Sequence, residues 1–384
     1  MAERVRVLAG TTKGLFVLTS TDGRKTWDVA GPLCNGWPIN HALGDAGSGM
    51  LWAAGGGDWH GAGVWRSADG GATWELSQLS NGQMDEWLAN DPEGAAYLGL
   101  TPSPPAPFGK TIKTLWSLGR VGNRLYAGAK PAGLYESSDG GESWSPVDGL
   151  NNHPSGPSWE PGGAGLVLHT ILTDAARPER LWVGISAAGV FASEDGGATW
   201  ERRNRLSNAA ADHDHAHPGA CGHEIGYCVH NMVRVEGSDL IYQQNHHGVY
   251  RSQDGGRSWE DITAGLPSNF GFPVAVHPGD PQTLWVLPLN GDTKGRFPPD
   301  ARAQVWRSRD GGASWQGLGQ GLPEKNCFFT VLRQAMATDR MEAPGVYFGT
   351  NSGSVFASFD EGDQWHQIAQ HLPTVLCVET VTGG

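Results

Sequence analysis

The 384-residue sequence contains no apolar run that approaches the roughly 20 residues of a membrane-spanning helix. Its first residues, Met1 to Leu8, hold no apolar core of the kind that a secretory signal peptide has. We therefore expect a soluble cytoplasmic protein with no membrane partner.

Cysteine and basic residues are also scarce. The five cysteines are scattered and odd in number, which favours free thiols in a reducing compartment over a disulfide framework. There are 27 lysines and arginines against 40 aspartates and glutamates, which gives a net charge of −13. Binding to nucleic acid needs clustered basic side chains on the phosphates, so we expect no nucleic-acid partner.

What the sequence has in excess is glycine, with 57 residues, and tryptophan, with 17. Many of both belong to one phrase, S-x-D-G-G-x-[ST]-W. Five copies end at Trp74, Trp144, Trp200, Trp259 and Trp315, and two degenerate copies end at Trp27 and Trp365. Aspartate followed by glycines favours a tight turn, and β-rich residues flank each copy, so each predicts a strand, a turn and a strand. The period of roughly 50 to 60 residues indicates a repeat architecture.

These seven phrases resemble the Asp-box, or BNR, repeats of sialidase-like β-propellers, within the wider WD40/YVTN/BNR-like group. The resemblance covers the whole chain. It implies an all-β fold, a seven-bladed propeller of four-stranded antiparallel blades, in a single domain of residues 1–384. In that family the Asp-box lies on the outer edge of a blade, away from the usual active site, so it indicates fold more than function.

The two ends of the chain predict how the ring closes. Val5–Gly10 reads as a second strand with no first strand before it, whereas Thr374–Thr380 reads as an inner strand with nothing after it. We expect the C-terminal strand to complete the N-terminal blade, which leaves no open sheet edge.

Long insertions separate several of the expected blades. The resemblance puts them on the face opposite the Asp-box turns, where long loops on a repeat scaffold usually form the binding site. They are residues 75–111, 145–165, 201–227 and 292–303.

Histidines recur on the expected inner strands. His41, His169 and His230 align in the second, fourth and fifth repeats, with Trp116 in the same slot of the third. Equivalent slots point to the central channel, where three imidazoles could hold one divalent transition metal ion, namely Zn, Fe, Cu or Mn. The alternative is that these histidines line a wet channel and bond to backbone and water.

Other polar residues belong to the same region. Glu160 and Glu379 are candidate general acids or bases, and His246 and His247 could share that role or orient the metal ligands. Arg333 could hold an anionic substrate, because its fork matches a carboxylate.

A histidine-rich segment, residues 212–223, precedes the fifth blade, and its role is open. A second possible zinc site lies partly within it, formed by Cys221, His223, Cys228 and His230, although the spacing is unfamiliar.

Three kinds of function fit this sequence. The histidine slots favour an enzyme with a metal-binding site at the top of the channel, acting on a small or sugar-like molecule. The second is a sialidase-like glycoside hydrolase using carboxylates, although the family's arginine triad and F-R-I-P-like segment have no match here. The third is a non-catalytic binding propeller, similar in repeat number to photosystem-assembly factors.

Overall fold

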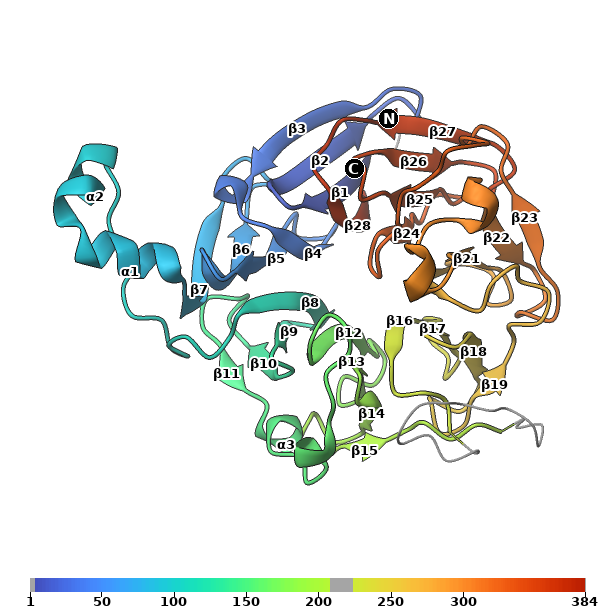
Figure 1. Cartoon of the computed structure of the whole chain (residues 1–384), viewed down its shortest axis with the longest axis horizontal. Coiled ribbons are helices and arrows are strands. Elements are labelled where there is room, and N and C mark those ends of the chain that lie inside the picture. The colour runs from blue at the N-terminus through green and yellow to red at the C-terminus, as the bar shows by residue number, and fades with distance from the viewer. Residues whose placement is uncertain (1–3, 208–223, 384) are drawn as a thin grey trace.

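The computed structural model describes residues 4–207 and 224–383. Within these ranges the strands form seven four-stranded antiparallel sheets, which stand around a central channel as the blades of a propeller (Figure 1). The predicted fold class is therefore confirmed.

Each blade runs from an inner strand at the channel to an outer strand at the rim. The first blade contains β28 (Val375–Thr382), β1 (Val5–Thr11), β2 (Gly14–Ser20) and β3 (Asp28–Leu33), and the second β4 (Ile39–Gly44), β5 (Leu51–Gly57), β6 (Gly61–Ser67) and β7 (Glu75–Asn81). The third contains β8 (Thr114–Val121), β9 (Arg124–Lys130), β10 (Leu134–Ser137) and β11 (Ser145–Pro146), and the fourth β12 (Val167–Thr173), β13 (Leu181–Ser186), β14 (Gly189–Ser193) and β15 (Glu201–Arg202). The fifth contains β16 (Val229–Arg234), β17 (Ile241–Asn245), β18 (Val249–Ser252) and β19 (Glu260–Asp261). The sixth contains β20 (Gly271–Val276), β21 (Leu284–Pro288), β22 (Val305–Ser308) and β23 (Gln316–Leu318), and the seventh β24 (Met336–Thr338), β25 (Val346–Gly349), β26 (Val355–Ser358) and β27 (Trp365–Ala369).

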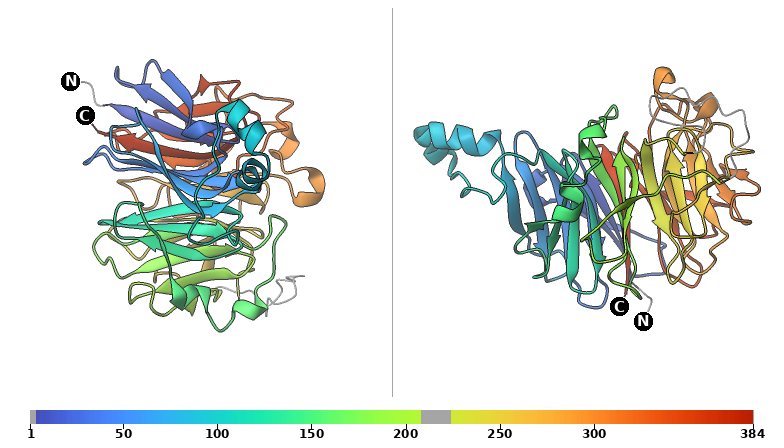
Figure 2. Two further views of the ribbon diagram at one scale, coloured as in Figure 1. Left: turned by 90° about the vertical axis from the view of Figure 1, so that its left-hand side faces the viewer. Right: turned by 90° about the horizontal axis from the view of Figure 1, so that it is seen from below.

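Short helices interrupt the links between strands. They are α1 (Gln83–Asn90), α2 (Pro92–Leu98), α3 (Asp148–Asn151) and the 3₁₀ turns η1 (Cys34–Gly36), η2 (Gly156–Ser158), η3 (Asp292–Lys294) and η4 (Pro299–Ala301). The helical hairpin α1–α2, which the sequence did not lead us to expect, projects beyond the ring (Figure 2). In the described residues, no helix has the length and apolar character needed to cross a membrane.

The C-terminal strand closes the ring as predicted. β28 pairs antiparallel with β1, with Val7 opposite Thr380 and Ala9 opposite Val378. The side chains of Val7, Ala9 and Val378 are fully buried. The first blade therefore combines the two ends of the chain, and hydrogen bonds rather than a covalent link hold the ring shut.

The repeated phrase forms the same turn in each blade, between the third and fourth strands. In the second blade, Asp69 accepts hydrogen bonds from Ser67 Oγ at 2.7 Å, Thr73 N at 2.9 Å and Thr73 Oγ1 at 2.6 Å. The Trp74 indole donates to Gly71 O at 3.0 Å, and Gly71 has φ of +101°. One carboxylate thus organises the whole turn.

The blades define two faces of the molecule. We call the face with these turns the turn face, and the opposite face the insertion face. The insertion face carries α1, α2 and η2 in links between blades, and η3 and η4 in the link between β21 and β22. The inner strands run from the insertion face to the turn face, so the residue at the start of each inner strand lies near the insertion face.

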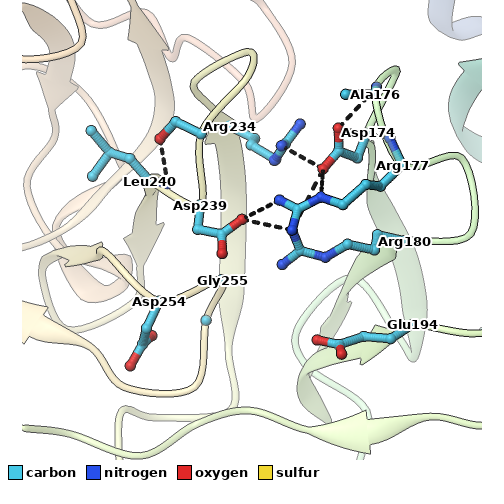
Figure 3. Close-up of polar contacts among 12 residues, drawn as sticks. Asp174, Ala176, Arg177, Arg180, Glu194, Arg234, Asp239, Leu240, Asp254 and Gly255 are labelled. Carbon is cyan, nitrogen blue, oxygen red and sulfur yellow. Dashed lines mark hydrogen bonds and ion pairs between the residues drawn. The ribbon is translucent and has the colours of Figure 1, made fainter.

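A charged network joins the fourth and fifth blades on the turn face (Figure 3). Asp174 has a side chain only 2% exposed and lies 2.8 Å from Arg234 and 3.5 Å from Arg180. Asp239 lies 2.6 Å from Arg180, whose guanidinium stacks on the buried Trp182 ring. Every buried charge here has a partner, so this network stabilises the blade interface and leaves no cation available for a ligand.

Candidate functional site

A β-bulge near the start of several inner strands fixes which side chains are equivalent. The register skips one residue at each bulge: Asn40 in β4, Trp116 in β8, His169 in β12 and His230 in β16. His41 lies one position beyond its bulge. A shift of one residue turns a side chain to the other face of a strand. The alignment of His41 with His169 and His230 was therefore wrong, and Asn40 occupies the equivalent position.

His41 lies toward the turn face. Its Nδ1 accepts a hydrogen bond from Leu118 N at 2.9 Å, and its Nε2 faces Glu379 Oε1 at 3.4 Å. Both residues line a cavity of about 620 Å³ formed by the turn-face halves of the inner strands. The predicted acid or base Glu379 thus pairs with His41 at the turn-face end of the channel.

His169 is fully buried in the wall of the channel. Its Nε2 lies 2.7 Å from Val229 O and its Nδ1 lies 2.9 Å from Thr170 Oγ1, so both ring nitrogens have partners. Burial, together with the charge of Arg333, lowers the pKa of His169 to about 3. This neutral ring joins two neighbouring blades through the Val229 carbonyl.

The segment Arg333–Gln334, which precedes β24, bonds to three other blades. Arg333 O accepts a bond from Asn231 Nδ2 at 2.8 Å, and Gln334 Nε2 donates to His169 O. Gln334 O accepts from Val378 N at 2.8 Å. Three other blades therefore fix this backbone, with the cavity of His41 and Glu379 on its turn-face side.

A thiol and two imidazoles gather toward the insertion face. Cys228, His230 and His246 each offer a ligand atom, and these atoms all lie within 4.8 Å of one another. Cys228 Sγ is 3.6 Å from His230 Nε2. We call this set of three potential metal ligands the Cys–His cluster. It contains neither His41 nor His169.

The environment of His230 sets its protonation. Its Nδ1 lies 2.6 Å from Gly271 O and donates to it, which leaves the Nε2 lone pair facing Cys228. Burial, together with the charge of Arg333, holds the pKa of His230 well below its usual range. The rings of Phe270 and Phe272 lie 5.2 Å and 4.7 Å from the imidazole, centre to centre. The ring is therefore neutral and fixed, as a metal ligand or general base must be.

Of the other predicted residues of this face, His247 lies next to the cluster and Glu160 lies on the surface. His247 contacts His246, with ring centres 5.0 Å apart, and Asp292 Oδ2 lies 3.7 Å from His246 Nε2. Glu160 is exposed, and its backbone oxygen accepts a bond from Ala187 N at 3.1 Å.

Only two of the four residues of the second predicted zinc site lie among the described residues. Cys228 and His230 do lie together, whereas Cys221, His223 and the rest of segment 212–223 fall outside the described residues. Cys228 immediately precedes β16 and His230 is the bulged residue of that strand. Their closeness in the sequence is the signal that could have favoured Cys228 over His41.

No protein-family model matches the chain. A xyloglucanase of Paenibacillus sp is 29% identical to it over 255 residues, which are 59% of this chain and 22% of that protein. The chain spans about a quarter of the length of the curated relatives it matches, which are xyloglucanases.

Solved structures share the propeller fold at low sequence identity. An ancestral GH74 enzyme superposes with a TM-score of 0.57 at 15% identity, over 86% of this chain and 38% of that one. YCF48 bound to a D1 peptide superposes with a TM-score of 0.52 at 15% identity, over 86% and 82%. Together these findings define a seven-bladed β-propeller with xyloglucanase relatives.

Proposed function

We propose that this propeller is an enzyme acting on a small molecule, and that the Cys–His cluster at the insertion-face end of its channel binds one divalent transition metal ion. The observation that carries the proposal is the convergence of Cys228, His230 and His246 within 4.8 Å. The predicted ligand set of His41, His169 and His230 is thereby replaced by one that shares only His230 with it.

The spacing of the cluster fits a shared ion. With metal–sulfur bonds of about 2.3 Å and metal–nitrogen bonds of about 2.0 Å, two tetrahedral ligand atoms lie about 3.5 Å apart. Cys228 Sγ and His230 Nε2 are 3.6 Å apart. A thiolate and imidazoles favour zinc, copper or iron over magnesium and calcium.

The neighbouring residues have orienting roles in this proposal. The Gly271 carbonyl selects the tautomer of His230, as partners of metal-bound histidines commonly do. The Asp292 carboxylate lies 3.7 Å from His246 Nε2 and places a negative charge beside that ring. Three protein ligands leave a position for substrate, and a bound metal would polarise a substrate oxygen there as a Lewis acid.

Cobalt substitution tests the proposal at the level of the ligands. Chelator-treated protein titrated with Co²⁺ should develop a thiolate-to-cobalt charge-transfer band that is absent in Cys228→Ser and weakened in His246→Asn. The matched control Cys327→Ser, a buried cysteine elsewhere, should leave the band unchanged. A Co²⁺ spectrum without a thiolate band in the wild-type protein would contradict the proposed site.

The xyloglucanase relatives favour a second candidate, a glycoside hydrolase. Trp59 and Trp87, which are 47% and 37% exposed, face each other on the insertion face with ring centres 6.4 Å apart. Exposed aromatic rings of this kind can stack on a sugar. Hydrolysis by a carboxylate pair needs no metal, so chelator-resistant cleavage of aryl glycosides or xyloglucan oligosaccharides would support this candidate over the first.

A further inference from the structure

Arg333 is partly buried, and it differs in its partners from four more fully buried arginines of the described chain. Each of these four has a carboxylate within 3.1 Å and a side chain at most 6% exposed. They are Arg180 with Asp239, Arg203 with Glu201, Arg234 with Asp174 and Arg307 with Asp363. Arg333 has no ion pair of this kind with any described residue. Its Nε is buried without a hydrogen-bond partner, as are those of Arg234 and Arg307, so the missing carboxylate is what sets it apart.

An unpaired guanidinium is costly to remove from water. Burial lowers the pKa of Arg333 to about 10, in the direction expected for a cation that lacks a partner. The nearby carboxylate of Asp292 offsets this only in part, because it is also engaged by Arg296. The site therefore has an unused capacity for negative charge.

Two aromatic rings lie beside this guanidinium. Its central carbon lies 4.9 Å from the Phe272 ring centre and 5.8 Å from that of Trp116. Stacking of this kind occupies the faces of a guanidinium, whereas its N–H groups point outward along the edges. The edges can thus form the paired hydrogen bonds that a carboxylate or phosphate accepts.

Two further cations lie around the same site. Arg296 contacts the Phe272 ring at 5.7 Å. The glycine loop Gly162–Gly165 lies beside Cys228, Arg296 and Lys130. A Cβ atom added to Gly162 would lie 3.9 Å from Cys228 Sγ, and one added to Gly163 would lie 3.7 Å from Arg296 Nη2. A Cβ atom added to Gly165 would lie 3.4 Å from Lys130 Nζ. In a chain of net charge −13, Arg333, Arg296 and Lys130 outnumber the Asp292 carboxylate that pairs with Arg296, so this channel end would attract anions.

We infer that Arg333, supported by Arg296 and Lys130, binds an oxyanion group of the substrate, a carboxylate or a phosphate, beside the Cys–His cluster. This rests on the proposed function in one respect, which is that the cluster is the reacting centre. The bound anion would then hold the rest of the substrate next to Cys228, His230 and His246.

Calorimetry with the full chain tests this inference. Chelator-treated protein is titrated separately with inorganic phosphate and with malonate, which distinguishes the two oxyanions. We expect at least one of the two anions to bind, and its binding should be at least about tenfold weaker in Arg333→Gln. The loss of affinity should be smaller in Arg333→Lys, which keeps the positive charge but not the planar pair of N–H donors. The control Arg302→Gln removes an exposed charge from the same face and should change the affinity less than about twofold.

Thermal unfolding and a zinc titration separate this inference from the proposed function. Because Arg333 has no ion-pair partner among the described residues, Arg333→Gln should unfold at the same temperature as the wild type or higher, whereas Arg234→Gln should unfold lower. Unchanged oxyanion affinity in Arg333→Gln, or no binding by the wild type, overturns the inference even if zinc binds. Oxyanion binding that depends on Arg333 without any zinc binding upholds it and overturns the metal site.

Discussion

At the scale of single residues, a one-residue bulge decided which histidines share a site. The spacing of polar residues on the expected inner strands was visible in the sequence and singled out His230 and Arg333. His246 and His247 were singled out in the link between the second and third strands of the fifth blade. The bulge at Asn40 was not visible, because no residue type marks it, and it moves His41 toward the turn face. Cys228 received less weight than His41 as a metal ligand. Its contact with His230 depends on both side chains pointing in the same direction, which the sequence does not show.

The charged network between the fourth and fifth blades gives a prediction at the same scale. Asp174→Asn should lower the free energy of unfolding by about 3 kcal/mol, because it leaves the buried Arg234 and Arg180 short of a partner. Asp239 is 34% exposed, so Asp239→Asn should cost about 1 kcal/mol or less. Urea unfolding of both variants checks the order, and equal losses would show that burial does not govern this network.

At the scale of the element, the repeated turn was the part of the fold most readable from sequence. Its aspartate and glycines each have a physical task, so the phrase marks the position of the turn in every blade. The degenerate copies keep the backbone conformation of the turn without its glycine. Arg24 and Glu361 stand at glycine positions and have φ of +69° and +61°. The α1–α2 hairpin had no such signal, because its apolar residues lie mostly exposed.

Acid sensitivity should follow the turn aspartates. Hydrogen bonds from Ser314 and Ser308 lower the pKa of Asp310 from 3.8 to about 2. A carboxyl with a lowered pKa in the folded state contributes stability above pH 4, and this contribution is lost as the pH falls through about 2. The melting temperature of Asp310→Asn should therefore fall below that of the wild type at pH 6, and the gap should narrow toward pH 2.

The control for this prediction is Glu324→Gln, which removes an exposed carboxylate from the insertion face. Its difference in melting temperature from the wild type should stay small throughout the range. A gap for Asp310→Asn that widens as the pH falls would reverse the expected sign.

At the scale of the whole molecule, the two chain ends predicted the closure of the ring correctly. A chain ending at Pro373 lacks β28 and leaves β1 as an open edge with buried side chains exposed. We expect it to aggregate or to lose cooperative unfolding, as measured by size-exclusion chromatography and tryptophan circular dichroism. A peptide of residues 374–384 should restore the folded signal in part.

The matched control replaces residues 91–99, which include α2, with two glycines. This also deletes a segment of the chain but leaves every blade intact, so the melting temperature should change by only about 2 °C. If the truncated chain stays monomeric and as stable as the wild type, closure by β28 does not hold the ring together.

The central claim is that the insertion-face end of the channel holds a transition metal ion on Cys228, His230 and His246. Elemental analysis of protein purified without a histidine tag and reloaded with zinc, iron, copper or manganese tests it most directly. The account predicts about one equivalent of metal per chain. This metal should be lost in His230→Asn and retained in His366→Gln, an exposed histidine on β27. Less than about a tenth of an equivalent in the wild-type protein would contradict the claim.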